Sequence, residues 1–223
     1  MNDLTLVIPA KKESESLPLV LEELKKYDLN LLVILEPSDL ETIDAIKNYN
    51  CEIIFQKNKG YGDAILLGIQ KVKTEFFCIF NADGSFNPAE LNGMYKKLKY
   101  DNFDVVFASR YEKNCGTDDD TIITMIGNYF FTIFGRIFFG LKITDILYTY
   151  VMATTIRIKN LDLKSKDFKL CVELPIKSQK AKLNITTSKS YERSRISGFK
   201  KVNAFKDGLL ILLGMIKLFF NKL

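Results

Sequence analysis

The residues of this sequence best suited to chemistry follow short apolar segments, where polar side chains stand at the ends of predicted strands. Asn81 and Asp83 are two residues apart in an extended segment, so their oxygens project to the same side and can hold Mg²⁺ or Mn²⁺ against a diphosphate. An Asx turn leading into Pro88 accounts for the same residues equally well. Arg110 also follows an apolar segment, where its forked guanidinium suits an anion; a surface ion pair is the alternative.

Two further strand ends carry groups that suit a ligand. Pro9 ends the first apolar segment, and Glu13 follows it closely enough to point into a ligand site. Gly60 and Gly62 stand just before a predicted helix, where glycine allows a phosphate to approach the backbone. A tight turn explains this glycine pair equally well, because the third glycine of a dinucleotide-binding loop is missing.

The chain of 223 residues contains no histidine, which excludes an imidazole base and every histidine-liganded metal site. Carboxylates, cations, amides and hydroxyls must therefore carry any chemistry. The four scattered cysteines form no C-x-x-C pair, and the first residues do not resemble a signal peptide. We therefore expect a reducing, cytoplasmic setting without a zinc site.

The elements that must position these residues alternate along the first half of the chain. Apolar runs of strand length are separated by segments whose apolar residues have helical spacing. This alternation predicts right-handed βαβ units and therefore a Rossmann-like α/β fold, in which helices flank a mostly parallel sheet. In such a sheet, the ligand lies beyond the carboxyl ends of the strands. The expected strands cover residues 4–9, 31–35, 52–56, 76–80 and 104–108, and the expected helices cover 16–27, 39–48, 63–71 and 88–100.

The pattern changes beyond residue 120. We expect a strand over 151–158, a helix over 168–180 and a short strand over 183–187. We interpret the aspartates at 118–120 as a solvated loop that caps the next helix.

Charge also divides the chain. Residues 1–156 carry 16 Lys and Arg against 22 Asp and Glu, whereas residues 157–223 carry 16 against 5. Two very apolar segments, 122–141 and 208–220, are interrupted by charged or polar residues. They are either ordinary buried helices or helices in the membrane interface with lysines toward anionic headgroups, and the basic last third favours the interface. Nucleic-acid binding is not expected, because aromatic residues are not interleaved with the basic ones.

Taken together, the motifs V-I-P-x-x-x-E, N-x-G-x-G-x-A, N-A-D and S-R-Y resemble, in order and spacing, those of family 2 glycosyltransferases. Asn128, Asp145 and the run 191–201 are similar to landmarks of the branch that glycosylates polyprenyl phosphates, of the dolichol-phosphate mannose synthase type. The resemblance covers nearly the whole chain and implies one GT-A (nucleotide-diphospho-sugar transferase) domain over residues 1–223. Within it, residues 1–118 would bind the nucleotide sugar, and residues 119–223 would form the acceptor and membrane-interface part, with C-terminal amphipathic helices.

The resemblance also implies a set of site residues. Asp83 and Asn81 would hold a divalent metal, Mg²⁺ or Mn²⁺, and Asp83, Arg110 and Arg195 would be catalytic. The residues implied to bind the donor, a UDP- or GDP-linked sugar, are Pro9, Glu13, Glu36, Lys59, Gly60, Gly62, Asn81 and Ala82, and those implied to bind the acceptor phosphate are Arg110, Arg195, Lys200 and Lys201.

Some positions depart from the family pattern. After the second strand the chain reads Glu36-Pro37, where proline removes a backbone donor at a position usually held by glycine. Asn81 keeps an oxygen but lacks the charge of the usual aspartate. Downstream of Asp145, the chain has Thr149 where the family has glycine and Val151 where the family has arginine.

The implied chemistry is compatible with the lack of histidine. A phosphate acceptor is already anionic near neutral pH, so transfer to it needs alignment and stabilisation of the leaving diphosphate, but no general base. We therefore expect an inverting hexosyltransferase that acts on undecaprenyl or dolichyl phosphate, peripherally bound to the inner face of the membrane. One alternative is transfer to a saccharide hydroxyl with Glu173 or Asp145 as base. Another is a degenerate, non-catalytic member that retains nucleotide or membrane binding.

Overall fold

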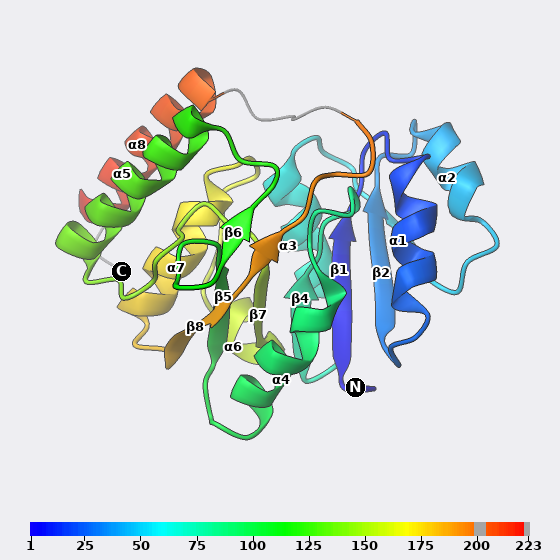
Figure 1. The fold of residues 1–223 in the computed structure, drawn as a ribbon, viewed down its shortest axis with the longest axis horizontal. Coiled ribbons are helices and arrows are strands. Elements are labelled where there is room, and N and C mark those ends of the chain that lie inside the picture. Colours follow the sequence, from blue (N-terminus) through cyan, green and yellow to red (C-terminus); the bar gives the residue numbers. More distant parts are fainter. Residues whose placement is uncertain (199–203, 221–223) are drawn as a thin grey trace.

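Seven strands form one mixed sheet in the computed structural model, which describes residues 1–198 and 204–220 (Figure 1). Their order across the sheet is β3-β2-β1-β4-β7-β5-β8, and β7 runs antiparallel to both of its neighbours. The strands are β1 (Leu4–Pro9), β2 (Asn30–Leu35), β3 (Glu52–Phe55), β4 (Phe76–Ile79), β5 (Val105–Ser109), β7 (Val151–Thr154) and β8 (Ile185–Lys189). Two short strands, β6 (Gly116–Thr117) and β9 (Tyr191–Glu192), pair in parallel beside this sheet.

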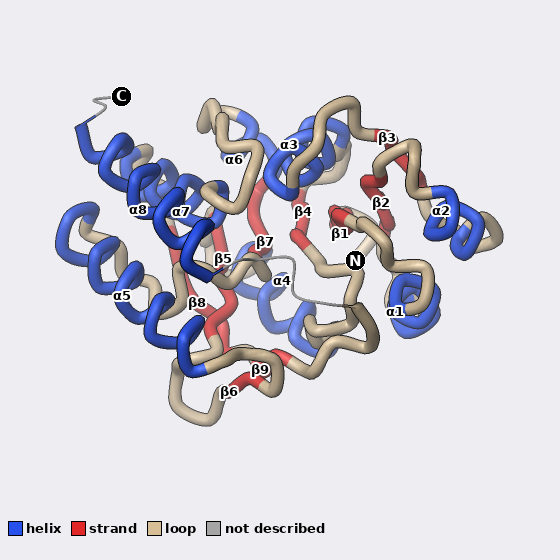
Figure 2. Tube along the Cα trace, turned by 90° about the horizontal axis from the view of Figure 1, so that it is seen from above, coloured by secondary structure: helices blue, strands red, loops and turns tan. Residues whose placement is uncertain are grey.

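Helices cover both faces of the sheet, which gives three layers (Figure 2). Leu6 and Ile8 of β1 face one apolar core and Val7 faces the other, because successive side chains of a strand point to opposite faces. The first core includes residues of α1 (Ser16–Leu24), α2 (Leu40–Ile46) and α4 (Leu91–Lys99), and the second includes residues of α3 (Tyr61–Lys71), α5 (Ile122–Phe139), α6 (Thr155–Lys159), α7 (Leu170–Lys180) and α8 (Ala204–Phe220).

The predicted mostly parallel sheet flanked by helices is confirmed. The strand predicted over 151–158 is wrong in its second half, where β7 ends at Thr154 and α6 begins. Ile158 and Leu161 are three residues apart and both buried, so a helical turn packs them into the core despite the β-branched residues around them. The helix predicted over 88–100 begins as a 3₁₀ turn over Pro88–Glu90 before α4.

Helices α5 and α8 pack against each other at one end of the molecule (Figure 1). Each has a buried stripe, with Phe131 on α5 and Ile211 and Met215 on α8. Asn128 lies on the buried stripe of α5, where its Oδ1 accepts a hydrogen bond from Leu147 N (2.9 Å). The two segments are therefore half-buried helices rather than fully buried ones.

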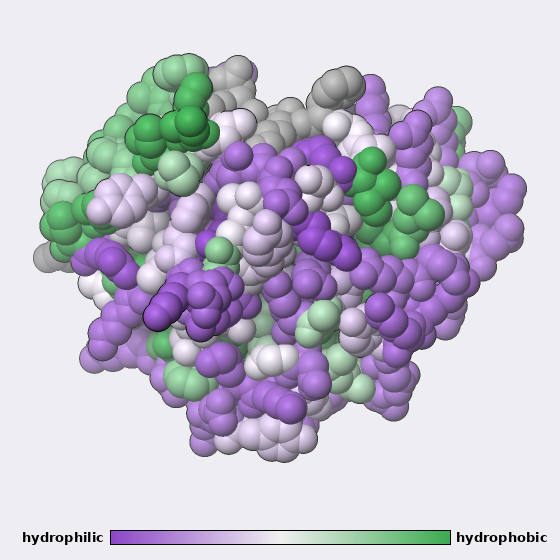
Figure 3. All heavy atoms as spheres, in the orientation of Figure 1, coloured by the Kyte–Doolittle hydropathy of each residue, from purple (hydrophilic) through white to green (hydrophobic). Residues whose placement is uncertain are grey.

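The outer stripes of the same two helices are apolar and exposed, and Figure 3 shows this surface in green over α5 and α8. By length and composition α5 is able to cross a membrane, and 22% of it is buried within the protein. Because its inner stripe packs on the core, lipid cannot surround it in this fold. We call the exposed surface the α5–α8 face; it consists of Ile122, Ile123, Met125, Ile126, Tyr129, Phe130, Ile137 and Phe138 of α5 and Phe205, Leu209, Leu210, Leu213, Ile216, Phe219 and Phe220 of α8.

Candidate active site

The order of the strands reverses between β1 and β4, because β2 and β3 lie on one side of β1 and β4 lies on the other. In open α/β sheets, ligands bind beyond the carboxyl ends of the strands at such a reversal. The loops after β1 and β4, which contain Glu13, Asn81 and Asp83, leave the sheet at this place. We call it the β1–β4 edge.

The loop after β4 forms the Asx turn that the sequence indicated. Asp83 Oδ1 accepts hydrogen bonds from Ser85 N (3.0 Å) and Ser85 Oγ (2.7 Å), and Gly84 adopts a φ of 82° that suits glycine. The second oxygen of Asp83, Oδ2, lies 3.8 Å from Nη1 of Arg195. Asp83 and Arg195, both predicted to be catalytic, are therefore neighbours in space.

Asn81 is oriented by a tyrosine that the sequence motifs did not indicate. Tyr61 donates its hydroxyl hydrogen bond to Asn81 Oδ1 (3.1 Å), and the same hydroxyl lies 2.8 Å from Thr149 Oγ1. Burial raises the pKa of the Tyr61 phenol, which keeps it a neutral donor. At position 149 the resemblance implied a glycine, and the threonine found there provides a polar contact to Tyr61.

A segment close to the C-terminus crosses the β4 loop. We call residues 191–196 the strap. Arg193 N donates to Ser85 O (2.9 Å), and Ile196 N donates to Asp83 O (2.8 Å). A Cβ on Gly84 would lie 2.5 Å from the side chain of Ile196, so the strap lies directly against the turn.

Arg193 anchors the strap through its side chain. Its guanidinium donates to the carbonyl oxygens of Gly84 (3.1 Å) and Phe86 (2.8 Å) and forms a two-pronged ion pair with Glu23, both distances being 3.0 Å. A planar fork of donors fits this arrangement, and lysine could not reproduce it. The sequence analysis gave the run 191–201 as similar to family landmarks and singled out Arg195, but it assigned no role to Arg193.

Arg195 is held in place by Asp119. Nε and Nη2 of Arg195 donate to the two carboxylate oxygens of Asp119, at 3.1 and 2.7 Å. The Asp119 side chain is 16% exposed. The prediction of a solvated loop over 118–120 is therefore wrong for Asp119 and Asp120, which pair with half-buried Arg195 and buried Arg110, whereas Asp118 is exposed. Thr121 is the residue that caps α5.

Arg110 lies in a buried ion-pair cluster rather than in a surface pair. Its Nε and Nη2 donate to Asp145 (2.7 and 3.0 Å), and Nη1 donates to Glu192 (2.9 Å) and lies 3.4 Å from Asp120. Its guanidinium carbon also lies 4.5 Å from the ring centre of Tyr148. Arg110 thereby joins β5, β9 and the loops that enter α5 and β7, and contact with an acceptor phosphate stays a prediction.

The two glutamates predicted to bind the donor lie at the ends of β1 and β2. Glu13 is buried and accepts a hydrogen bond from Ser16 Oγ (2.6 Å), while its backbone N donates to Thr42 Oγ1 (3.0 Å). Glu36 pairs with Lys11 at 2.7 Å and has a side chain that is 14% exposed. Both carboxylates are thus held close to the β1–β4 edge.

Close packing, rather than the approach of a phosphate, explains why glycines stand at positions 60 and 62. A Cβ on Gly60 would lie 2.2 Å from Lys166 O, and one on Gly62 would lie 2.4 Å from Ser165 O. Asp63 N also donates to Lys166 O (3.0 Å). The glycines therefore let the loop over residues 162–169 pack on the start of α3, and their role in donor binding stays a prediction.

The remaining predicted residues differ in how the structure places them. Pro9 and Ala82 are buried and contribute backbone at the β1–β4 edge, whereas Lys59 is exposed. Lys200 and Lys201 lie outside the described residues.

The two carboxylates considered as general bases are already engaged. Both oxygens of Asp145 accept hydrogen bonds from Arg110. Burial alone would raise the pKa of Glu173, but hydrogen bonds from Lys177 and from the backbone of Ser165 and Lys164 lower it. A strongly hydrogen-bonded, acidic carboxylate is a poor proton acceptor.

The donor set at the β4 loop fits a hard divalent cation. Asp83 and Asn81 offer oxygen ligands only, and among the described residues no group of three or more acidic, cysteine or histidine side chains could hold a metal by itself. Mg²⁺ sites commonly use one or two protein ligands and complete their coordination with substrate phosphates and water. The residues present therefore fit a metal that binds together with a diphosphate.

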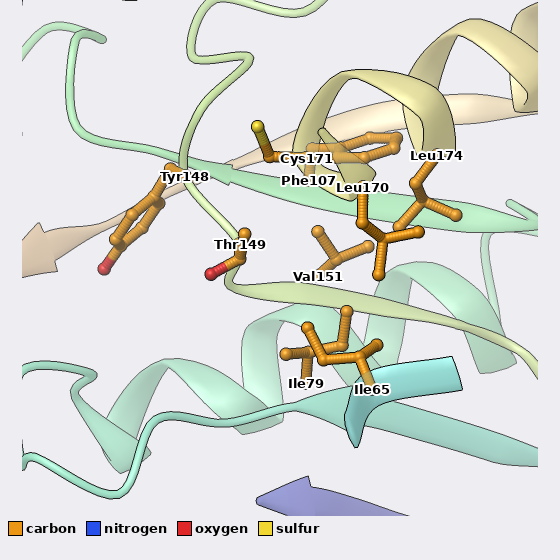
Figure 4. Close-up of a pocket in the computed structure, with 9 residues that line it drawn as sticks. All are labelled: Ile65, Ile79, Phe107, Tyr148, Thr149, Val151, Leu170, Cys171 and Leu174. Carbon is orange, nitrogen blue, oxygen red and sulfur yellow. The ribbon is translucent and has the colours of Figure 1, made fainter. Parts of the chain in front are cut away.

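One internal cavity is too small for a ligand. Figure 4 shows the side chains around a cavity that is lined by strand residues such as Ile79 and Val151 and by helix residues such as Leu174. Its volume is about 10 Å³. That volume is at the lower limit for one water molecule, so a nucleotide sugar cannot enter. This cavity is therefore not the donor site.

Comparison with known proteins identifies the class. Residues 5–157 match the family model of glycosyl transferase family 2, and the chain belongs to this family. It is 24% identical over 219 residues to an uncharacterized protein of Methanocaldococcus jannaschii, with 89% of each chain covered. It is also 28% identical over 94 residues to an uncharacterized glycosyltransferase of Mycobacterium tuberculosis, which covers 42% of this chain and 43% of that protein.

Solved structures agree with this assignment at the level of the fold. Glucosyl-3-phosphoglycerate synthase from Mycobacterium tuberculosis, in complex with Mn²⁺, UDP-glucose and phosphoglyceric acid, superposes with a TM-score of 0.77 at 12% identity, covering 97% of this chain and 79% of that one. Its complex with Mn²⁺, UDP and glucosyl-3-phosphoglycerate gives 0.76, also at 12% identity, covering 96% and 79%. The protein is a glycosyltransferase with the GT-A fold.

Proposed function

We propose that this glycosyltransferase moves a hexose from a UDP- or GDP-linked donor to a polyprenyl phosphate, at the inner face of the membrane. The observation that carries the proposal is the continuity between the site and the α5–α8 face. Asp119 holds Arg195 beside Asp83, and α5 with its exposed apolar stripe begins three residues later at Ile122. A lipid lying along this face would bring its phosphate to the β1–β4 edge.

The site residues divide the work of a direct displacement. Arg195 would attract the acceptor phosphate, whose oxygen forms the new bond to the anomeric carbon while the bond to the leaving diphosphate breaks, inverting the configuration. Asp83 and Asn81 would hold the divalent cation, which when bound stabilises negative charge on the diphosphate. Arg193 and Asp119 keep Arg195 in place.

The engaged carboxylates support a phosphate acceptor over a hydroxyl. Asp145 and Glu173 are the bases considered for a hydroxyl acceptor, and both are occupied by hydrogen bonds. The fold neighbours suggest a second candidate, because their crystals hold phosphoglyceric acid. Transfer to such a small acceptor uses a hydroxyl and requires a base that these two residues do not offer.

Donor and metal binding can be tested by thermal shift, because a ligand that binds only the folded protein raises the melting temperature. UDP, GDP and their hexose derivatives, each with and without Mn²⁺, should reveal one nucleotide whose stabilisation depends on the metal. Asp83→Asn should abolish the metal-dependent part, whereas Asp44→Asn, an equal charge change on α2, should retain it. No shift with any nucleotide would favour the non-catalytic alternative, and an intact shift in Asp83→Asn would refute the metal site.

Membrane attachment can be tested by vesicle co-sedimentation. Leu209 and Leu213 are 60% and 54% exposed on α8, and Leu19 and Leu40 are similarly exposed at the other end of the molecule. Burying a leucine contributes roughly 1.5–3 kcal/mol, so Leu209→Asp with Leu213→Asp should weaken vesicle binding about 100-fold or more. Leu19→Asp with Leu40→Asp is the matched control and should bind as the wild type does. Equal binding of the two double variants would contradict attachment through the α5–α8 face.

A further inference from the structure

A second concave site lies beside α8 and has no part in the proposed reaction. It is a groove of about 700 Å³ between the loop over residues 162–169, α7 and the C-terminal half of α8. We call it the lysine groove, because lysines outnumber carboxylates in its lining by six to three. The lysines are Lys164, Lys166, Lys169, Lys177, Lys180 and Lys217, and the carboxylates are Asp162, Asp167 and Glu173.

Each carboxylate of the groove already has a lysine partner. Asp162 pairs with Lys164 and Asp167 with Lys169, both at 2.8 Å, and Glu173 pairs with Lys177 at 2.9 Å. Of the other three lysines, Lys166 lies 3.7 Å from Asp63, which is outside the lining, Lys180 donates to Leu218 O, and Lys217 is exposed on α8. The lining as a whole holds more lysines than carboxylates. This local excess matches the basic character of the last third of the chain.

Glu173 gives the groove a defined wall. Its carboxylate accepts hydrogen bonds from the backbone N of Lys164 (3.0 and 3.1 Å) and of Ser165 (2.7 Å), which fixes the loop to α7. On the opposite wall, Lys180 Nζ donates to Leu218 O (2.6 Å) near the end of α8. The stem of Lys169 lies against Gly214, where an added Cβ would approach within 3.0 Å. The groove is therefore assembled by specific contacts and is not a chance gap between mobile side chains.

The groove adjoins the α5–α8 face along α8. Gly214 and Leu218 line the groove, while Leu213 and Ile216 belong to the exposed apolar face. Lys217 lines the groove and is itself exposed. Its neighbours in sequence are Ile216, which belongs to the apolar face, and Leu218, which lines the groove. A membrane in contact with the apolar face would thus place its headgroup layer at the groove.

We propose that the lysine groove binds the phosphate headgroup of an anionic membrane lipid. Ammonium groups bind phosphate as point charges, and the adjoining apolar face accommodates the attached acyl chains. Such a site would orient the enzyme on anionic membranes separately from any acceptor lipid. The inference rests on the membrane attachment in the proposed function.

The test compares binding to vesicles of phosphatidylcholine alone with binding to vesicles that also contain phosphatidylglycerol, at low ionic strength. The groove variant combines Lys166→Gln, Lys169→Gln and Lys217→Gln. The control combines Lys25→Gln, Lys26→Gln and Lys47→Gln, which remove the same charge near α1 and α2, away from α8 (Figure 1). Basic residues near an anionic surface contribute roughly fivefold each, so the groove variant should lose on the order of 100-fold in binding to the anionic vesicles. Its binding to phosphatidylcholine alone should match that of the wild type.

Equal losses in the groove and control variants would overturn the proposal, because they would show a general charge effect. A second outcome is that inorganic phosphate raises the melting temperature of the wild type but not of the groove variant, while the two proteins bind vesicles equally. This result would reassign the groove to a soluble phosphate. Failure of the proposed membrane attachment has a separate signature, since the wild type would then bind neither kind of vesicle.

Discussion

Replacing Arg110 with methionine should destabilise the protein strongly. The substitution keeps most of the apolar stem but removes the only cation that the described structure places among Asp145, Glu192 and Asp120, whose side chains are 0%, 10% and 7% exposed. Breaking a buried ion pair by removing one partner costs about 3–5 kcal/mol, since the remaining charges lose their compensation. For a chain of this size, 1 kcal/mol corresponds to roughly 2–4 °C, so the melting temperature should fall by about 6–20 °C.

The assay is thermal unfolding followed by circular dichroism, with Arg157→Met as the control. Arg157 forms an ion pair with Asp104 at 3.1 Å but is 59% exposed, and exposed pairs contribute about 0–1 kcal/mol. Arg110→Lys should fall between wild type and Arg110→Met, because lysine keeps the charge but not the two-pronged geometry. If Arg110→Met melts within about 2 °C of the wild type and only its acceptor KM rises, Arg110 contacts the acceptor and the structural argument is refuted.

Three further outcomes follow from the contacts around the site. Gly62→Ala should lower the melting temperature, because its Cβ would collide with backbone of the 162–169 loop. The control is Gly93→Ala, whose Cβ meets nothing within 4 Å and which should be neutral or slightly stabilising. Equal effects of the two substitutions on the melting temperature would contradict the packing argument. Arg193→Ala should lower kcat/KM on the order of 10- to 100-fold by loosening the strap, and Arg193→Lys should restore little of it; unchanged kinetics in a folded variant would show that the strap does not position the site. Glu173 has a lowered pKa despite its burial, so its contribution to stability is present above the pKa of the unfolded state and is lost as pH falls through the folded value. Glu173→Gln should therefore reduce the loss of stability at acid pH, measured as melting temperature against pH, and a curve parallel to that of the wild type would argue against this role.

The sheet could be predicted because its evidence is local. Each strand of the first half is a short apolar run, and the polar residues that follow it reach the same edge in any parallel sheet. The position of Asn81 and Asp83 at this edge was predicted in this way, and the Asx turn was the alternative to a metal site that the sequence left open. The second half of the segment 151–158 was mispredicted because packing of Ile158 and Leu161 outweighed local preference.

The partners of the charged site residues could not be predicted, because they come from distant parts of the chain. Arg195 pairs with Asp119, and Arg193 pairs with Glu23, 170 residues away. Tyr61 was visible only as the residue between two glycines, although its hydroxyl orients Asn81. The count of charged residues predicted that the last third is basic, but it could not predict which residues form ion pairs with each other.

The central claim, transfer of a sugar to a polyprenyl phosphate, is tested most directly by following a radiolabelled sugar from its nucleotide into lipid. Purified protein with Mn²⁺ and the nucleotide sugar that stabilises it would be incubated with undecaprenyl phosphate, dolichyl phosphate, 3-phosphoglycerate or no acceptor. We predict label in the organic phase with a polyprenyl phosphate only, and none with Asp83→Asn. Label transferred to 3-phosphoglycerate, or released without any lipid product, would contradict the proposed function.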